Sequence, residues 1–207
     1  MATSTAFEEK DLLRIVKYFK GAMAIRNRAL ILFGCGTGFR INEILTLRRN
    51  DVLNKCGNYR ESVTLFCSKT DKQRTIKLNP LVIKHLDEWL KVLERNGYEL
   101  KEDHVFISLH TGKPIKFITA YLILKNACRY LNIRKPYSTH SMRKYFGKNI
   151  YMFYADRRNS GEVKDPLIKA KEGLGHVNIK DTERYLNFML GNVSEAVDHL
   201  FDRSEVI

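Results

Sequence analysis

The stretch that organises this chain is Leu174-Gly175-His176-Val177-Asn178-Ile179-Lys180-Asp181-Thr182-Glu183-Arg184-Tyr185-Leu186. Gly175 is expected to end one short helix, and His176 then stands at the turn. A second helix follows, and it carries Tyr185. A histidine and a phenol hydroxyl can therefore reach one pocket from two helices. The alternative is structural, because a Gly-His pair after a helix usually forms a C-cap and a helical tyrosine usually packs half-buried. The rest of the chain decides between these interpretations.

The charge balance points to a polyanionic partner. The 207 residues include 36 Lys and Arg against 23 Asp and Glu, a formal net charge of +13. The excess is spread through ordered-looking sequence instead of lying in a tail. Nucleic acid is favoured over an anionic membrane surface, because no helix pairs a broad apolar face with a basic one. With no bilayer-length apolar run and no leader pattern, we expect a cytoplasmic protein, associated with DNA if the nucleic acid is DNA.

Hydrophobic periodicity predicts a mainly α fold with one small antiparallel β-hairpin, in the α+β class. Three glycines within residues 34–38 indicate a joint between two helices. Leu81 is expected to begin the buried stripe of the helix that starts at Pro80. The first six residues read as a disordered start. We expect helices at about 7–20, 22–33, 39–47, 80–95, 117–131, from 139, 166–174 and 192–201, and strands at 62–67 and 74–78.

The four cysteines give no sign of a metal centre. They form no C-x-x-C pair and have no histidines at zinc-finger spacing. Free thiols are the simpler interpretation, and no metal site is expected. The cysteines are Cys35, Cys56, Cys67 and Cys128.

Two helix starts carry arginines that call for an explanation. A cation at the position of Arg40 opposes the helix dipole, and Glu43 on the same face can orient its guanidinium. A surface Arg–Glu pair is the structural alternative. Farther along, Ser138 or Thr139 caps a helix on which His140 and Arg143 fall side by side. Together with the free backbone N–H groups, that second pair forms a site for an anion such as phosphate.

The hairpin tip gathers the basic residues Lys69, Lys72 and Arg74. Such a tip can enter a groove or follow a phosphate backbone, although solvated lysines on a turn are commoner.

In this order, these pieces resemble the catalytic domain of the tyrosine recombinases, the family of phage integrases and Xer-type resolvases. The resemblance runs from about Phe7 to Leu190. It implies a mainly α catalytic-domain fold and a site-specific DNA recombinase that cleaves and rejoins strands through a covalent 3′-phosphotyrosine. It rests on Thr37-Gly-Phe-Arg-Ile-Asn-Glu-Ile-Leu45, Lys69-Thr-Asp-Lys-Gln-Arg74, Thr139-His-Ser-Met-Arg143, and Leu174-Gly-His176 followed by Tyr185.

The resemblance also implies a role for each residue. Tyr185 is the nucleophile, and Arg40 and Arg143 clamp the non-bridging phosphate oxygens. His140 and His176 donate hydrogen bonds to those oxygens or help to deprotonate the tyrosine. No metal or nucleotide cofactor is implied, since arginines can stabilise the charge and the covalent link keeps the bond energy. The remaining roles are general acid for Lys69, positioning of an arginine for Glu43, and DNA contact for Lys72, Arg74 and Lys144.

The implied assembly is a homotetramer on DNA, with accessory DNA-bending proteins as possible partners. The helix at 192–201 would dock onto an adjacent protomer. Residues 1–207 are expected to be one catalytic domain without the N-terminal DNA-clamping domain. That suits either an excised fragment or the single-domain fimbrial phase-switch recombinases. The spacing from Arg143 to His176 exceeds that of the simplest members, and the excess falls in the loop 156–162. The loop would contact DNA or a neighbouring protomer, or is a tolerated surface insertion.

Two rival functions remain at this point. One is a non-catalytic, sequence-specific DNA-binding regulator on the same scaffold, and the completeness of the residue set argues against it. The other is an enzyme like type IB topoisomerases or telomere resolvases, which the short length disfavours. The DNA target, and integration against excision or inversion, cannot be read from phosphate-contacting residues. We also expect Tyr185 to lie away from Arg40, His140 and Arg143 without DNA, because the family delivers its nucleophile on a mobile segment.

Overall fold

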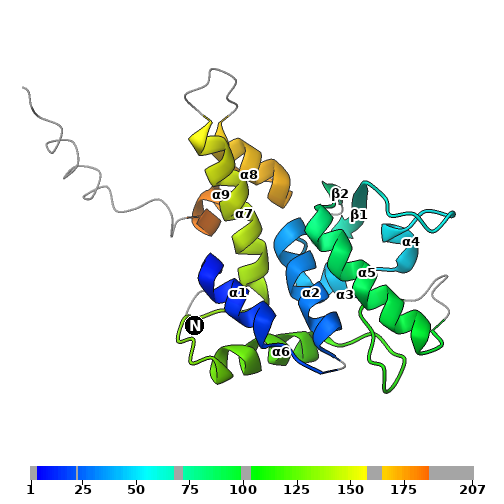
Figure 1. Ribbon diagram of the computed structural model, residues 1–207. Coiled ribbons are helices and arrows are strands. Elements are labelled where there is room, and N and C mark those ends of the chain that lie inside the picture. The colour runs from blue at the N-terminus through cyan, green and yellow to red at the C-terminus, as the bar shows by residue number, and fades with distance from the viewer. Residues whose placement is uncertain (1–3, 22, 68–71, 99–103, 158–164, 187–207) are drawn as a thin grey trace, which may run out of the picture.

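The computed structural model describes residues 4–21, 23–67, 72–98, 104–157 and 165–186. Within these ranges the structure is mostly helical with one antiparallel hairpin, as predicted (Figure 1). In the hairpin, Ser62 pairs with Lys77 and Cys67 with Lys72. The elements are α1 (Glu9–Tyr18), α2 (Ala24–Thr37), α3 (Ile41–Leu45), α4 (Arg49–Val52), β1 (Ser62–Cys67), β2 (Lys72–Lys77), α5 (Pro80–Arg95), α6 (Phe117–Tyr130), α7 (Thr139–Asp156), α8 (Pro166–Leu174) and α9 (Ile179–Leu186).

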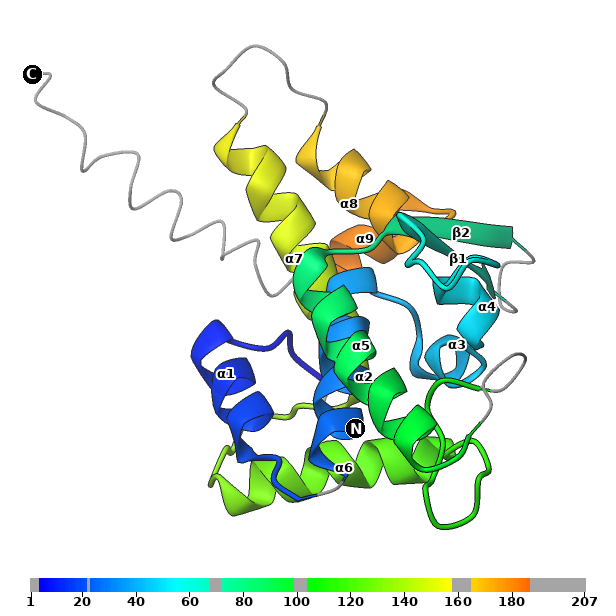
Figure 2. The ribbon, with the colours of Figure 1, turned by 45° about the vertical axis from the view of Figure 1, so that its right-hand side comes forward.

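Helix α7 joins the two halves of the structure. It packs against α2 on one side and α8 on another, and α2 in turn packs against α5. In both views α6 lies below α1 and α2, while α8, α9 and the hairpin lie toward the top (Figure 1, Figure 2). The core between these layers includes the fully buried Trp89, Phe33 and Phe106. Trp89 donates its indole N–H to the Val105 carbonyl at 2.6 Å, so its polar atom is satisfied inside the core.

The predicted joint at residues 34–38 was wrong, because α2 continues through Thr37. Gly34 and Gly36 are helical, and each lies against a neighbouring helix. A Cβ on Gly34 would stand 2.6 Å from the sulfur of Met142, and one on Gly36 would stand 2.5 Å from Val82. The low helix propensity of glycine is outweighed here by the close approach of α7 and α5. Only Gly38, with φ of 61°, ends the helix.

Several boundaries differ from the prediction for local reasons. The helix after Gly38 is only the five-residue α3, since Arg40 is still extended at its N-cap. Leu81 is 53% exposed, and Val82 takes the predicted buried place at the start of α5. Residues 4–6 are not a disordered start, because Ala6 is buried and the Ser4 carbonyl accepts a hydrogen bond from Lys144 at 2.7 Å.

Ser138 caps the start of α7 and Gly175 ends α8, as predicted. Ser138 accepts the His140 N–H at the start of α7, and Asp165 caps α8 ahead of Pro166. Gly175 takes the left-handed conformation, φ 63°, that ends α8. The hairpin turn 68–71, residues 158–162 of the predicted loop and the predicted helix 192–201 lie outside the described residues.

No helix in the described ranges is both long enough and apolar enough to cross a membrane.

Candidate active site

A pocket of about 460 Å³ opens where the first turn of α7 meets the α2–α3 turn and the α8–α9 segment. Five of the six residues predicted to be catalytic line it, and the sixth, Lys69, lies outside the described residues. These five residues come from three separate parts of the sequence, and Ser4 adds a fourth part to the pocket lining. Its lining comprises Arg40, His140, Arg143, His176 and Tyr185, with Lys144, Ser4, Gly175, Val177, Asp181 and Arg184.

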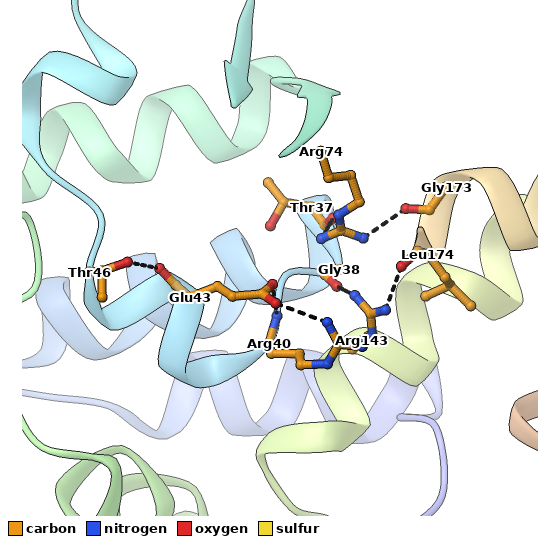
Figure 3. Close-up of polar contacts among 9 residues, drawn as sticks. All are labelled: Thr37, Gly38, Arg40, Glu43, Thr46, Arg74, Arg143, Gly173 and Leu174. Carbon is orange, nitrogen blue, oxygen red and sulfur yellow. Dashed lines mark hydrogen bonds and ion pairs between the residues drawn. The ribbon is translucent and has the colours of Figure 1, made fainter. Parts of the chain in front are cut away.

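Arg40 is held by Glu43, as the sequence predicted. The Glu43 carboxylate accepts the Arg40 backbone N–H at 2.8 Å and its Nη1 at 2.9 Å. The carboxylate is buried, whereas the Arg40 side chain is about a quarter exposed toward the pocket. Figure 3 shows this pair at the start of α3. An arginine at a helix N-terminus is thus compensated by a buried partner, and its guanidinium keeps a set direction.

Arg143 is buried at 3% exposure and ties two helix ends together. Its Nη1 donates to the Gly38 carbonyl at the end of α2, and its Nη2 donates to the Leu174 carbonyl at the end of α8. Both partners lie more than thirty residues away along the chain. These bonds fix the guanidinium at the floor of the pocket (Figure 3).

The two histidines of the pocket have lowered pKa values. Burial, with Arg143 and Arg40 nearby, lowers the pKa of His176 to about 4. The same causes, desolvation first, lower the pKa of His140. His176 Nδ1 lies 3.0 Å from the Thr182 hydroxyl on α9, which orients its ring. At neutral pH His176 is therefore uncharged.

Tyr185 lies inside the pocket, so the expectation that it stands away from the arginines was wrong. Its ring meets that of His176 edge to face at 5.3 Å between centroids, and Lys144 Nζ lies 5.1 Å from its centroid. Its hydroxyl contacts the His140 carbonyl at 3.5 Å. Burial raises the pKa of Tyr185 to about 12 and outweighs the opposite effect of the nearby Arg143 and Arg40 charges. The reason is the packing of α9 on α8 and α7, which turns the tyrosine inward.

The three predicted DNA contacts differ in position. Lys72 is exposed at the start of β2, and Lys144 lines the pocket beside Tyr185. Arg74 is only 9% exposed, so the expectation that it lies on a solvent-facing tip was wrong. Its burial has a physical reason in the pleat, because it shares one face of β2 with Ile76. Strand alternation could have indicated this.

Sequence reasoning missed part of the pocket wall. Asp181 and Arg184 line the pocket, and Thr182 is the buried partner of His176. Asp181 stands four residues before Tyr185, so helical spacing places both on one face of α9. That spacing was the available signal, and it was not used. Ser4 had no such signal, since only the fold brings it to the pocket.

The sequence matches the phage integrase family over residues 5–189, and the chain belongs to that family. A relative in Bacillus subtilis, "Probable integrase/recombinase YoeC", is 32% identical over 161 residues, covering 78% of this chain and 77% of that protein. Tyrosine recombinase XerD of Halalkalibacterium halodurans is 24% identical over 202 residues, or 95% of this chain and 61% of the relative. The chain thus spans about three fifths of the length of that XerD.

The fold recurs in solved structures. The crystal structure of the XerH site-specific recombinase bound to palindromic difH substrate, a post-cleavage complex, matches with a TM-score of 0.69 at 24% identity. The match covers 95% of this chain and 53% of that one. The predicted catalytic-domain fold is confirmed by this likeness.

Proposed function

We propose that this chain is a site-specific DNA recombinase that cleaves and rejoins strands through Tyr185. The observation that carries the proposal is the pocket itself, in which the tyrosine hydroxyl lies with two arginines and two histidines. A pocket of this composition suits a phosphodiester, because it offers a nucleophile, proton acceptors and fixed positive charge together. Membership of the phage integrase family supports the same reaction.

In the proposed reaction the arginines stabilise charge that develops on phosphorus. Arg40 and Arg143 already have set directions, through Glu43 and through two backbone carbonyls. Donors held in place before the reaction need little reorganisation when negative charge builds up on the non-bridging oxygens. The phosphate would enter where Arg40 is exposed to the pocket.

The proposed reaction needs an acceptor for the tyrosine proton. With its pKa near 12, Tyr185 is protonated at neutral pH and must lose a proton as its oxygen bonds to phosphorus. His176 is neutral at that pH and its ring lies against the Tyr185 ring. We assign His176 as the proton acceptor, with His140 as a donor or second acceptor at the other side of the pocket.

The remaining steps balance without any nucleotide cofactor. As the Tyr185 oxygen bonds to phosphorus, the bond to the 5′-oxygen breaks and that oxygen takes a proton, from Lys69 by resemblance. The product is a 3′-phosphotyrosine and a free 5′-hydroxyl. Rejoining is the reverse transfer, in which a 5′-hydroxyl attacks the phosphotyrosine, so the number of phosphodiester bonds is conserved.

Double-stranded DNA is the proposed partner, and a tetramer on DNA is the proposed assembly. The net charge of +13 suits a polyanion, and the XerH structure of the same fold is a complex with its DNA substrate. Lys72 and Lys144 are the proposed backbone contacts among the described residues. The tetramer, the docking of residues 192–201 and any accessory DNA-bending protein rest on the family resemblance alone.

The test is to trap the covalent adduct. The full chain is incubated with a pool of nicked DNA duplexes whose sequence is randomised around a fixed nick, so that cleavage near the nick releases a short fragment. We expect a DNA–protein adduct that survives denaturation, maps to Tyr185 by mass spectrometry and enriches one family of sequences.

Tyr185→Phe is the negative variant, and Tyr151→Phe, a half-buried α7 tyrosine outside the pocket, is its matched control. The first should form no adduct and the second should form as much as the unaltered protein. Equal trapping by Tyr185→Phe would remove the assigned nucleophile. Sequence-selective binding without an adduct would favour a regulator. Unselective relaxation of supercoiled plasmid would favour a topoisomerase-like enzyme.

A further inference from the structure

Arg74 is a buried arginine on the hairpin whose guanidinium reaches two helix ends. Its Nη1 donates to the Gly173 carbonyl at 2.7 Å, and its Nη2 donates to the Thr37 carbonyl at 3.2 Å. The guanidinium carbon also lies 4.2 Å from the centre of the Phe39 ring. A hairpin residue thus joins the end of α2 to the end of α8, as Figure 3 shows.

The carbonyls that Arg74 holds are neighbours of those that Arg143 holds. Arg143 donates to the next carbonyl along the chain at each helix end. These carbonyls belong to Gly38, which follows Thr37, and to Leu174, which follows Gly173. Two guanidiniums, one from β2 and one from α7, therefore bind consecutive carbonyls on both helices. The last carbonyls of a helix lack intrahelical partners and carry partial negative charge, so cations are favourable there.

The segments that these carbonyls belong to lead directly to functional side chains. Arg40 follows Gly38 by two residues, and His176 follows Gly175 at the end of α8. The α8 end also depends on close packing, because a Cβ on Gly175 would lie 3.0 Å from Cδ of Arg74. Any shift of the Arg74 side chain would therefore move the backbone on both sides of the pocket.

We propose that Arg74 is a positioning residue for strand cleavage, which sets Arg40 and His176 by holding the ends of α2 and α8. The effect on cleavage rate rests on the proposed function, whereas the effect on the positions of Arg40 and His176 does not depend on it. Its difference from a DNA contact is physical. A 9% exposed guanidinium with both Nη atoms on backbone carbonyls has little surface left to present to a phosphate.

The test separates chemistry from binding with Arg74→Met, which keeps the bulk of the stem, and Arg74→Lys, which keeps the charge but not the planar fork. The matched control is Arg26→Met, because Arg26 is also buried and donates to a backbone carbonyl, that of Ile107, outside this pocket. Single-turnover cleavage rate and dissociation constant are measured over a range of salt, on the duplex that the unaltered protein traps best.

We expect Arg74→Met to lower the saturating cleavage rate by about tenfold or more, as suits the loss of hydrogen bonds from a charged group. Its affinity for DNA and the salt dependence of that affinity should match the unaltered protein. Arg74→Lys should recover part of the rate, and Arg26→Met should leave it unchanged.

Three outcomes would overturn the inference. The first is weaker DNA binding by Arg74→Met at an unchanged saturating cleavage rate, with the slope of log affinity against log salt concentration reduced by about one. That result would make Arg74 a phosphate contact. An equal loss in Arg26→Met would mean general destabilisation. If the unaltered protein forms no adduct, the proposed function fails by itself, and Arg74 is then tested by NMR without DNA. The signals of the His176 ring and the Leu174 methyls should move in Arg74→Met and not in Arg26→Met, and unchanged signals would reject the positioning role.

Discussion

The C-terminal ends of α2 and α8 are built alike, and the side chains that follow them are held differently. Each helix ends on a left-handed glycine, Gly38 with φ of 61° and Gly175 with φ of 63°. Each also gives its last carbonyls to the guanidiniums of Arg74 and Arg143. The same local solution therefore serves both sides of the pocket.

Beyond the glycines the two ends differ in charge and in burial. After α2, Arg40 forms an ion pair with a buried carboxylate, that of Glu43, within the cap of α3. After α8, the His176 side chain has a neutral hydrogen-bond partner, Thr182, and the following residues Val177 and Ile179 are exposed. The α2 end thus holds a fixed charge, whereas the α8–α9 end presents the tyrosine on a more weakly tied segment.

Arg143 is shared by both ends, so its loss should have the largest effect. Arg143→Lys keeps one charge but lacks the planar fork whose two Nη atoms donate to the Gly38 and Leu174 carbonyls. We expect adduct formation to fall by about 10²- to 10³-fold, as when a preorganised donor to a developing oxyanion is removed. Quenched-flow trapping on the selected duplex measures it. A loss below about tenfold would mean that the two ends hold their positions without this residue.

Replacing Gly38 or Gly175 by alanine should lower the free energy of unfolding by different amounts at the two helix ends. A Cβ at Gly38 would stand 2.3 Å from the Phe146 ring, while at Gly175 it would stand 3.0 Å from Cδ of Arg74. Left-handed strain of about 1–2 kcal/mol applies to both, and overpacking adds about 1–3 kcal/mol at Gly38. Urea unfolding should therefore show Gly38→Ala to be the less stable variant. Equal midpoints would contradict the difference in packing.

Removing the partner of each functional side chain should show which end depends more on it. Glu43→Gln removes the charge from the contact with Arg40, so we expect cleavage to be roughly ten- to hundredfold slower. Thr182→Val removes a neutral hydrogen bond to His176, so we expect cleavage to be only about two- to tenfold slower. Asp51→Asn is the control, because Asp51 caps α4 in the same way, accepting the Arg48 N–H away from the pocket. A larger loss in Thr182→Val than in Glu43→Gln would reverse the comparison.

Acid should loosen the α8–α9 end before the α2 end. Burial lowers the pKa of His176 to about 4 from its ordinary 6.5, so the opened segment binds a proton more tightly than the closed one. The free energy that keeps residues 175–186 packed in the closed state is thus unaffected above pH 6.5. It falls as the pH drops from 6.5 to 4, and it changes no further below pH 4. Hydrogen exchange, corrected for intrinsic rate, should show residues 175–186 losing protection at pH 5 while residues 38–45 keep it. His176→Gln should remove this pH dependence, and equal loss at both ends would contradict the assignment.

Helix limits were predictable where a local signal sets them. Ser138, Pro166 and Gly175 begin or end helices through their own backbone and side-chain chemistry, and the structure places them as expected. The predicted break at Gly34 and Gly36 was wrong, because glycine is needed there for packing. Side chains of α7 and α5 approach the α2 backbone closely at these two positions. Propensity describes a helix alone and carries no information about what packs on it.

The sequence by itself indicated five of the side chains that line the pocket, and the pairing of Arg40 with Glu43 within one turn. The five are Arg40, His140, Arg143, His176 and Tyr185. Only the tertiary structure decided where Arg74 and Tyr185 point. The partners of Arg74 are carbonyls 37 and 99 residues away, and Tyr185 contacts a carbonyl 45 residues away. Every residue has a backbone carbonyl, so no residue type marks the partner in advance. Which carbonyl a buried guanidinium reaches is settled when the helices pack and unpaired polar groups must be satisfied.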